Sequence, residues 1–218
     1  LLLQEKEYIQ FLRDITTANN SLLIFDEVIT GFRLGFEGAA KYYEIQPDII
    51  TYGKIIGGGM PVGAYGASAA IMANISPDGA VYQAGTLSGN PVAMAAGIAA
   101  LTILAQPGFY EKQEATTLAF VETLRSFIAS NNFPVKIFTI GSIFWFAFTE
   151  KESILRADEI DPASMDNYKI MRRELLNRGI YFGPSGYEVG FISSAHTEAD
   201  LSQAITVIKE ALSLVFSK

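Results

Sequence analysis

One lysine stands alone in a long uncharged stretch of the chain. Lys54 is the single charged residue in IITYGKIIGGGMPVGAYG, residues 49–66, whose other members are mostly apolar or glycine. Lysines are seldom buried without a partner, so this placement calls for a chemical reason. Burial lowers the pKa of a lysine, and a neutral amine is the form that attacks a carbonyl carbon. Lys54 is therefore a candidate nucleophile for carbonyl chemistry.

A carboxylate follows another apolar run further upstream. Asp26 ends SLLIFD, and ligand sites in open α/β sheets lie at the carboxyl ends of strands. A Schiff-base lysine, with a buried carboxylate that keeps a pyridinium nitrogen protonated, is the arrangement that pyridoxal phosphate requires. The alternatives are that Asp26 caps a turn, and that the glycines at 57–59 and 63 do no more than form one.

The composition argues against several other kinds of chemistry. The chain has 218 residues, of which half are hydrophobic and 18% are charged, so it can bury a sizeable core in one large or two modest domains. A net charge of −7 argues against nucleic acid or an anionic membrane as a partner. With no cysteine and one histidine, His196, neither a thiolate or multi-histidine metal site nor a Ser-His-Asp relay is easily built. We expect His196 to cap or pack at a helix start.

The absence of cysteine also favours a reducing compartment. No signal peptide is visible, and the strongly apolar segment 92–105 is too short to span a bilayer. We therefore expect a cytoplasmic protein.

Apolar periodicity and turn residues predict where the elements lie. Helices are expected at 4–18, 37–43, 91–105, 109–130, 164–178 and 198–216, and strands at 21–25, 48–53, 135–149, 180–184 and 189–194. Residues 61–72 are expected to form a strand followed by a helical turn. The strand at 21–25 and the helix at 91–105 are apolar throughout, which predicts burial on all sides. The strand at 135–149 is expected to bend at Gly141. This order predicts an α/β first half and a small α+β second half, divided near 106–108.

Three longer stretches carry a family resemblance. LLIFDEVITGFR, PDIITYGKIIGGGMPVGAYG and YQAGTLSGNPVAMAAG resemble the class III pyridoxal-phosphate-dependent aminotransferases, in the same order. Within that family GTLSGNP and the SAHT segment look most like the glutamate-1-semialdehyde 2,1-aminomutases. The resemblance implies an aspartate-aminotransferase-like (fold type I) architecture. Residues 1–105 would be the C-terminal part of the large cofactor-binding α/β domain, and residues 106–218 the small C-terminal α+β domain.

The same resemblance implies roles for the residues that bind the cofactor. Lys54 would form the Schiff base with pyridoxal 5'-phosphate, and Asp26 would pair with its pyridine nitrogen. Val28 would pack against the ring, while Gly85 and Thr86 would bind the phosphate across a homodimer interface. Without the resemblance, Val28 would be an ordinary core residue and GTLSG a loop of small residues.

Two further positions concern the substrate. Tyr82 is expected to border the substrate pocket, although many such tyrosines are only half-buried. Glu188 stands in SGYEVGF, where class III enzymes that use glutamate or 2-oxoglutarate often place an arginine. An enzyme without an external amino donor needs no arginine there. The alternative is that Glu188 is an exposed strand carboxylate.

The aminomutase resemblance implies an isomerisation. Glutamate-1-semialdehyde would become 5-aminolevulinate, the precursor of tetrapyrroles, through a diamino acid and with the cofactor cycling through its pyridoxamine form. The chain is short for the family and lacks the upstream phosphate cup, so we expect weak or no activity from it alone. The alternatives are an ordinary class III ω-aminotransferase and a non-catalytic remnant that keeps only the fold.

Overall fold

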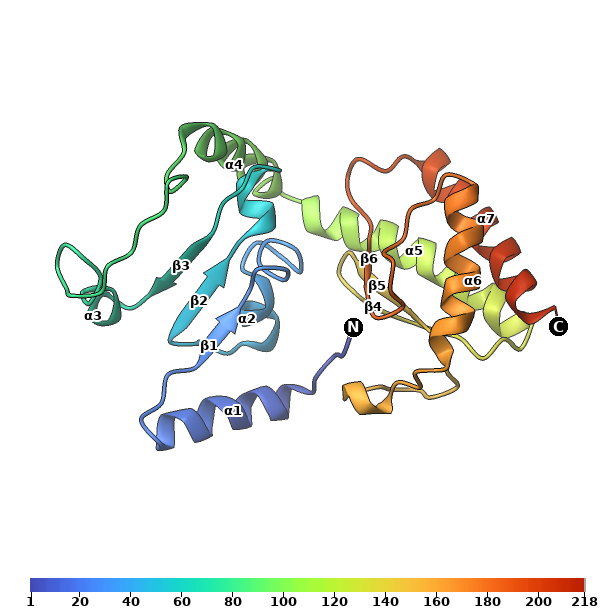
Figure 1. Cartoon of the computed structure of the whole chain (residues 1–218), viewed down its shortest axis with the longest axis horizontal. Helices are drawn as coiled ribbons and strands as arrows, with labels where there is room; N and C mark the ends of the chain where they lie inside the picture. Colours follow the sequence, from blue (N-terminus) through green and yellow to red (C-terminus); the bar gives the residue numbers. More distant parts are fainter. Residues whose placement is uncertain (218) are drawn as a thin grey trace. The chain divides into compact units, whose positions relative to one another are not determined.

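The computed structural model describes residues 1–217 and shows a mixed α/β chain (Figure 1). It divides into two compact units. The first is Gln4–Tyr110, and the second joins Leu1–Leu3 to the chain from Glu111 onward. The predicted domain limits, 1–105 and 106–218, stay a proposal.

A three-stranded sheet organises the unit Gln4–Tyr110. Strands β1 (Ile24–Asp26), β2 (Ile49–Tyr52) and β3 (Ala64–Ala67) lie in that order (Figure 1). β1 and β2 are parallel and β3 is antiparallel to β2. Because Asp26 pairs with Thr51, β1 and β2 end at the same edge of the sheet.

Helices precede, connect or follow these strands. They are α1 (Lys6–Ala18), α2 (Gly38–Tyr43), the 3₁₀ helix η1 (Lys54–Gly57), α3 (Ala69–Met72) and α4 (Pro91–Leu104). The start of α4 follows from its sequence: the Asn90 side chain accepts hydrogen bonds from the N–H groups of Val92 and Ala93, and Pro91 occupies the first helical position.

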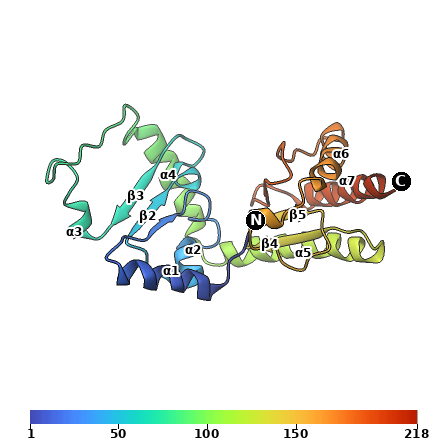
Figure 2. The same cartoon turned by 60° about the horizontal axis from the view of Figure 1, so that its bottom comes forward.

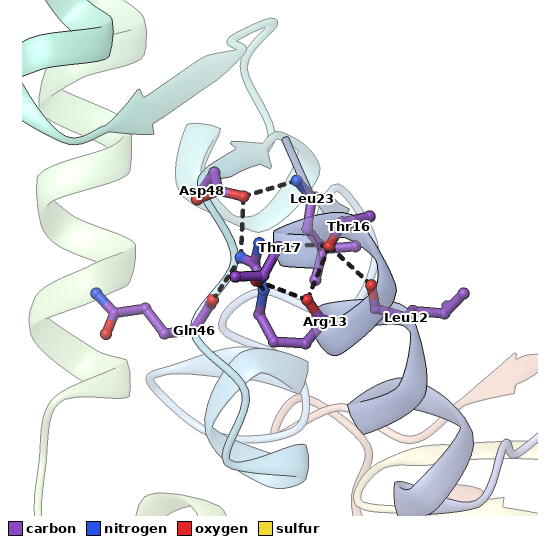
Figure 3. Close-up of polar contacts among 7 residues, drawn as sticks. All are labelled: Leu12, Arg13, Thr16, Thr17, Leu23, Gln46 and Asp48. Atoms are coloured by element: carbon purple, nitrogen blue, oxygen red, sulfur yellow. Dashed lines mark hydrogen bonds and ion pairs between the residues drawn. The ribbon is translucent and has the colours of Figure 1, made fainter. Parts of the chain in front are cut away.

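A half-buried ion pair fastens α1 to the start of the parallel strands (Figure 3). Arg13 Nη1 lies 2.9 Å from Asp48 Oδ2 and also donates to the Gln46 carbonyl at 3.2 Å. The same Asp48 oxygen accepts the Leu23 N–H at 2.7 Å. Arg13 Nε donates to Thr17 Oγ1 at 3.1 Å, which holds the guanidinium plane along the helix. One carboxylate thus joins α1, β1 and β2.

This clamp predicts a pH-dependent contribution to stability. The Leu23 N–H and the Arg13 guanidinium hold the pKa of Asp48 below its usual value of 3.8. A carboxyl group whose pKa is lower in the folded state stabilises the fold above its unfolded pKa, and that stabilisation is lost as the pH falls through the folded pKa. Asp48→Asn should therefore lower the urea midpoint of this unit at pH 6, and the gap from wild type should close below pH 3.8. Asp78→Asn, at an exposed position of the same unit, is the control; a gap that stays constant with pH would contradict the expectation.

Two segments of this unit are more exposed than the sequence predicts. In the 21–25 run, predicted to be buried on both faces, Leu22 is 55% and Ile24 56% exposed, because β1 pairs only with β2 and forms the sheet edge. In α4 the buried residues are Ala93 and Gly97, whereas Ile98 is 68% exposed. The expectation of all-round burial is wrong for both elements in this chain.

The second unit is built on an antiparallel sheet covered by helices. Its elements are α5 (Phe109–Ser130), β4 (Lys136–Ile140), β5 (Ile143–Ala147), η2 (Ala157–Glu159), α6 (Ser164–Asn177), β6 (Gly190–Phe191) and α7 (Glu198–Phe216). The strand order is β4-β5-β6, and α5 runs along the β4–β5 hairpin (Figure 2). A continuous core joins α5, the hairpin, α6 and α7; its fully buried members include Leu124, Leu175 and Leu212.

Two strand predictions in this unit are wrong. Residues 135–149 form two antiparallel strands rather than one bent strand, because Gly141 has a φ of 52° and reverses the chain between Ile140 and Ile143. Residues 180–184 form no strand, because side chains of α6 donate hydrogen bonds to carbonyl groups that a strand partner would otherwise use. Tyr168 Oη donates to the Gly183 carbonyl at 2.7 Å, and Arg172 Nε to that of Phe182 at 3.2 Å.

The outer edge of β4 is covered by a side chain of α5. Arg125 Nε donates to the Ile137 carbonyl at 3.1 Å, and Arg125 Nη2 donates to the same oxygen. Arg125 Nη1 also bonds to Glu122 one turn earlier, at 2.6 Å. The guanidinium therefore occupies an acceptor that an edge strand would otherwise leave open.

Within residues 1–217, no single helix has both the length and the apolar composition needed to cross a membrane. The consecutive helices Pro91–Leu104 and Phe109–Ser130 meet that requirement only when they are counted together.

Candidate active site

The two residues singled out first by the sequence lie at the same edge of the first sheet. Asp26 is the last residue of β1, and Lys54 follows β2 after Gly53. Adjacent strands lie about 4.8 Å apart, so parallel pairing brings the two strand ends together. This edge is where open α/β sheets bind ligands.

The Asp26 carboxylate is oriented by one of its oxygens. Oδ1 accepts the Val28 N–H at 3.0 Å and the Thr51 hydroxyl at 3.3 Å. Within residues 1–217, no protein donor contacts Oδ2, which can accept a hydrogen bond from a bound group. The side chain is exposed rather than buried as predicted, because this unit places nothing over the end of β1.

Lys54 adopts a strained backbone conformation. Its φ is 47°, in the left-handed region that a residue with a Cβ seldom occupies. Such strain is concentrated at functional sites, where the surrounding structure imposes it. The described chain gives its ammonium group no hydrogen bond or ion pair. The side chain is exposed, so the predicted apolar burial of the amine is wrong for this chain.

Val28 lies beside the lysine-bearing turn. A methyl group placed on Gly53 would be 3.3 Å from Val28 Cγ1, so the missing side chain of Gly53 lets the two strand ends approach. Val28 is half-buried and continues the edge that begins at Asp26. The structure therefore brings Asp26, Val28 and Lys54 together.

Helix α4 braces the turn that carries Lys54. A Cβ on Gly97 would collide with the carbonyl oxygen of Ile56, and a Cβ on Gly58 would collide with that of Ala96. Gly58 also has a φ of 55°, which suits glycine. Backbone touches backbone at both points, so the position of α4 sets the position of η1 and of the lysine at its start.

The loop GTLSG lies on a cavity of the same unit. This open cavity of about 810 Å³ is lined by Gly85, Ser88, Tyr52, Tyr65 and Met94 among others. Asp26, Lys54, Thr86 and Tyr82 are not among its lining residues. Thr86 is exposed, and Tyr82 is 82% exposed. The cavity thus includes Gly85 but not the other predicted ligands.

Glu188 and His196 belong to the other unit. Glu188 is exposed in a turn, not in a strand, and its N–H donates to the Ser185 carbonyl at 3.1 Å. Burial and, to a smaller degree, the charge of Glu188 together raise the pKa of the nearby Tyr168 to about 12. His196 Nδ1 accepts the Ser193 N–H at 3.0 Å, whereas Thr197 caps α7 with Asp200. Glu188 and His196 therefore belong to a different unit from Lys54.

One charged residue at the site escapes the sequence reasoning. Glu27 is 1% exposed, and its carboxylate accepts hydrogen bonds from Thr30 Oγ1 at 2.6 Å, Ala39 N at 2.9 Å and Ala40 N at 2.7 Å. Together with burial, its charge raises the pKa of Tyr52. Strand alternation could have predicted the burial of Glu27: successive side chains point to opposite faces, so if Asp26 faces a ligand, Glu27 faces the interior.

These residues suit a cofactor with a carbonyl carbon and a basic ring nitrogen. The Lys54 amine has no protein partner in the described chain, and one Asp26 oxygen is open to a donor at the same sheet edge. An amine forms a Schiff base with an aldehyde, and a carboxylate keeps a pyridine nitrogen protonated. The phosphate would need donors beyond this edge, for which Gly85 and Thr86 are candidates.

Solved structures share this fold over nearly the whole chain. An ω-transaminase from Sphaerobacter thermophilus is 28% identical, with a TM-score of 0.85 over 97% of this chain and 48% of its own. A β-phenylalanine aminotransferase from Variovorax paradoxus is 30% identical, with a TM-score of 0.86 over 96% of this chain and 48% of its own. A glutamate-1-semialdehyde aminomutase from Pseudomonas aeruginosa PAO1 is 21% identical, with a TM-score of 0.83 over 99% and 49%, which shows the fold alone.

The chain thus spans about half the length of the solved structures that it matches. The predicted α/β architecture of the pyridoxal-phosphate-dependent transferases is confirmed. Class III aminotransferases use pyridoxal phosphate, and one similar structure, 26% identical, is a transaminase with that cofactor bound. The model of the class III aminotransferase family matches residues 1–212, and this chain belongs to that family.

Proposed function

We propose that this chain carries the lysine side of a pyridoxal-phosphate site and takes part in amino-group transfer. The supporting observation is the pair formed by Lys54 and Asp26 at one sheet edge in a class III aminotransferase chain. Lys54 Nζ holds the cofactor through its aldehyde carbon, and Asp26 Oδ2 accepts the hydrogen bond of the ring nitrogen. Gly85 and Thr86 bind the phosphate across a homodimer interface.

The protein residues divide the chemistry with the cofactor. Pyridoxal phosphate, when bound, accepts into its protonated ring the electrons of the bond that breaks at a substrate carbon. Asp26 keeps the proton on the ring nitrogen because its negative charge favours the cationic ring. Lys54 Nζ would act as the general base and acid that moves a proton between two carbon atoms. Val28 packs on the ring and keeps water from it.

At the level of substrate, we propose the conversion of glutamate-1-semialdehyde to 5-aminolevulinate, the aminomutase reaction of tetrapyrrole synthesis in the cytoplasm. The wording of GTLSGNP and SAHT supports it, as does Glu188 where donor-using relatives often carry an arginine. Glu188 and Tyr82 would then face the substrate. The intramolecular exchange needs no second substrate, so the site must retain the diamino acid between its two halves.

A second candidate is an ordinary transaminase acting on a β- or ω-amino compound. The likeness to a β-phenylalanine aminotransferase at 30% identity and to an ω-transaminase at 28% supports it. The two reactions differ in their need for an acceptor. Turnover of glutamate-1-semialdehyde with no added 2-oxo acid supports the aminomutase, whereas amine loss only in the presence of a 2-oxo acid supports the transaminase.

Cofactor attachment tests both candidates at once. The purified chain is mixed with pyridoxal phosphate, reduced with borohydride and digested, and the pyridoxyl-labelled peptides are mapped. We expect the label on the peptide that contains Lys54. Label spread over surface lysines, with no preference for Lys54, would contradict a formed site in this chain.

A further inference from the structure

Glu27 carries a charge into the interior directly behind the candidate site. The alternation of β1 turns Asp26 toward the exposed edge and Glu27 toward α2. A buried carboxylate is costly unless it is fully hydrogen-bonded. Here both oxygens are used: Oε2 accepts from Thr30 and Ala39, and Oε1 accepts from Ala40.

The start of α2 is shaped around this carboxylate. Gly38 has a φ of 67°, and a Cβ there would collide with Glu27 Oε2. The Glu27 carbonyl also accepts the Gly31 N–H at 2.9 Å. Glu27 thus holds the loop 28–37 at two points, through its side chain at the start of α2 and through its backbone carbonyl at Gly31. This loop leaves β1 at Asp26, so its path sets the direction of the strand end.

The same closure determines the surroundings of Asp26. The Glu27 N–H donates to the Thr51 carbonyl at 2.9 Å, and the next N–H, that of Val28, donates to Asp26 Oδ1 at 3.0 Å. A rotation of the backbone at Glu27 would therefore move the donor that orients Asp26. The buried carboxylate on the opposite face prevents that rotation.

We propose that Glu27 is a positioning residue for Asp26. Its carboxylate holds the end of β1 against α2, so that Asp26 Oδ1 stays on the Val28 N–H and Oδ2 is kept for the ring nitrogen. The assignment of that nitrogen to Asp26 rests on the proposed function. The geometry behind it rests on the hydrogen bonds of the chain itself.

Two variants and a matched control separate this role from general loss of charge. Glu27→Gln keeps the size of the side chain. Its NH₂ group is only a donor, however, so the hydrogen bond that a backbone N–H makes to one carboxylate oxygen of Glu27 is lost. Thr30→Val removes only the 2.6 Å hydroxyl bond and is the milder variant if Glu27→Gln unfolds the unit. Glu37→Gln is the control: it removes the same charge at the N-cap of α2, where the side chain is exposed and caps no N–H.

The first measurement needs no cofactor. In NMR spectra of the free chain, wild type and Glu37→Gln should show one Asp26 χ1 rotamer and a Val28 amide shift that follows the Asp26 carboxylate. Glu27→Gln, or Thr30→Val to a smaller degree, should give averaged Asp26 couplings and a displaced Val28 amide. Unchanged couplings and amide shift in both folded variants would overturn the proposal.

The second measurement uses the cofactor-loaded chain. When Asp26 holds the ring proton less firmly, the ring nitrogen loses its positive charge more easily. That charge lowers the pKa of the nearby lysine-linked nitrogen, so its loss raises that pKa. The visible absorbance of Glu27→Gln should therefore titrate at least half a pH unit above wild type and Glu37→Gln. An identical titration would overturn the role toward the cofactor. Wild type that takes no label at Lys54 counts against the proposed function instead, and the NMR result then decides the positioning by itself.

Discussion

Gly97→Ala is expected to destabilise the unit Gln4–Tyr110 by about 1–2 kcal/mol. Gly97 is buried in α4, and a Cβ there would collide with the backbone carbonyl oxygen of Ile56. Overpacking typically costs 1–3 kcal/mol, and a backbone oxygen cannot move aside as a flexible side chain can. The better helix propensity of alanine returns only about 1 kcal/mol. Because Ile56 lies in η1, the displaced turn is the one that begins with Lys54.

Gly66→Ala is the matched control for this prediction. Gly66 lies in β3 of the same unit, and a Cβ there would meet nothing within 4 Å. Resistance to limited proteolysis of residues 4–110 should fall in Gly97→Ala and stay at the wild-type level in Gly66→Ala. The single tryptophan, Trp145, lies in the other unit, so its fluorescence checks that the substitution acts locally. Equal proteolysis of the two variants would show that α4 does not brace η1.

Three substitutions of Lys54 should separate chemistry from stability. Lys54→Ala and Lys54→Arg should both lose the pyridoxyl label completely, because neither side chain carries a primary amine that can form a Schiff base. Lys54→Gly should lose it too. However, φ is 47° at this position, so glycine removes a conformational strain of about 1–2 kcal/mol from the folded state. The greater freedom of glycine in the unfolded state offsets about 0.5–1 kcal/mol of this gain.

The expected pattern is therefore loss of labelling with no loss of stability. Lys54→Gly should resist urea as well as wild type or slightly better, whereas Lys54→Ala keeps the strain and should match wild type. Labelling is read by borohydride reduction and peptide mapping, and stability by proteolysis of the unit in urea. Lys169→Ala, at an exposed lysine of α6, is the control that should keep the label at Lys54. A Lys54→Gly chain much less stable than wild type would show that Lys54 is needed for the fold.

The strand ends of the site could be predicted because their signals are local. Apolar runs that stop at Asp26 and shortly before Lys54 predict strands whose carboxyl ends carry polar groups, and parallel pairing then puts both at one edge. Helix limits such as Asn90–Pro91 and the glycine after α6 follow from capping chemistry, and the structure confirms them.

What failed depends on partners distant in the sequence. Burial of β1 and α4 was predicted from apolar composition alone, yet composition does not say which element covers a face. The loop at 180–184 looks like a strand until Tyr168 and Arg172 take its carbonyl groups. The burial of Glu27 was missed because two consecutive charged residues after a strand are usually exposed to solvent. Only the fold shows that the first N–H groups of α2 donate to the Glu27 carboxylate.

The covered edge of β4 and the bare edge of β1 give the two units opposite tendencies toward strand addition. An incoming extended peptide that pairs with β4 must first displace the Arg125 guanidinium from the Ile137 carbonyl. Within residues 4–110 no side chain covers β1 in this way, and its exposed Leu22 and Ile24 lie at the margin of a parallel pair. Intermolecular sheet growth, the first step toward amyloid-like assembly, should therefore start in residues 22–26.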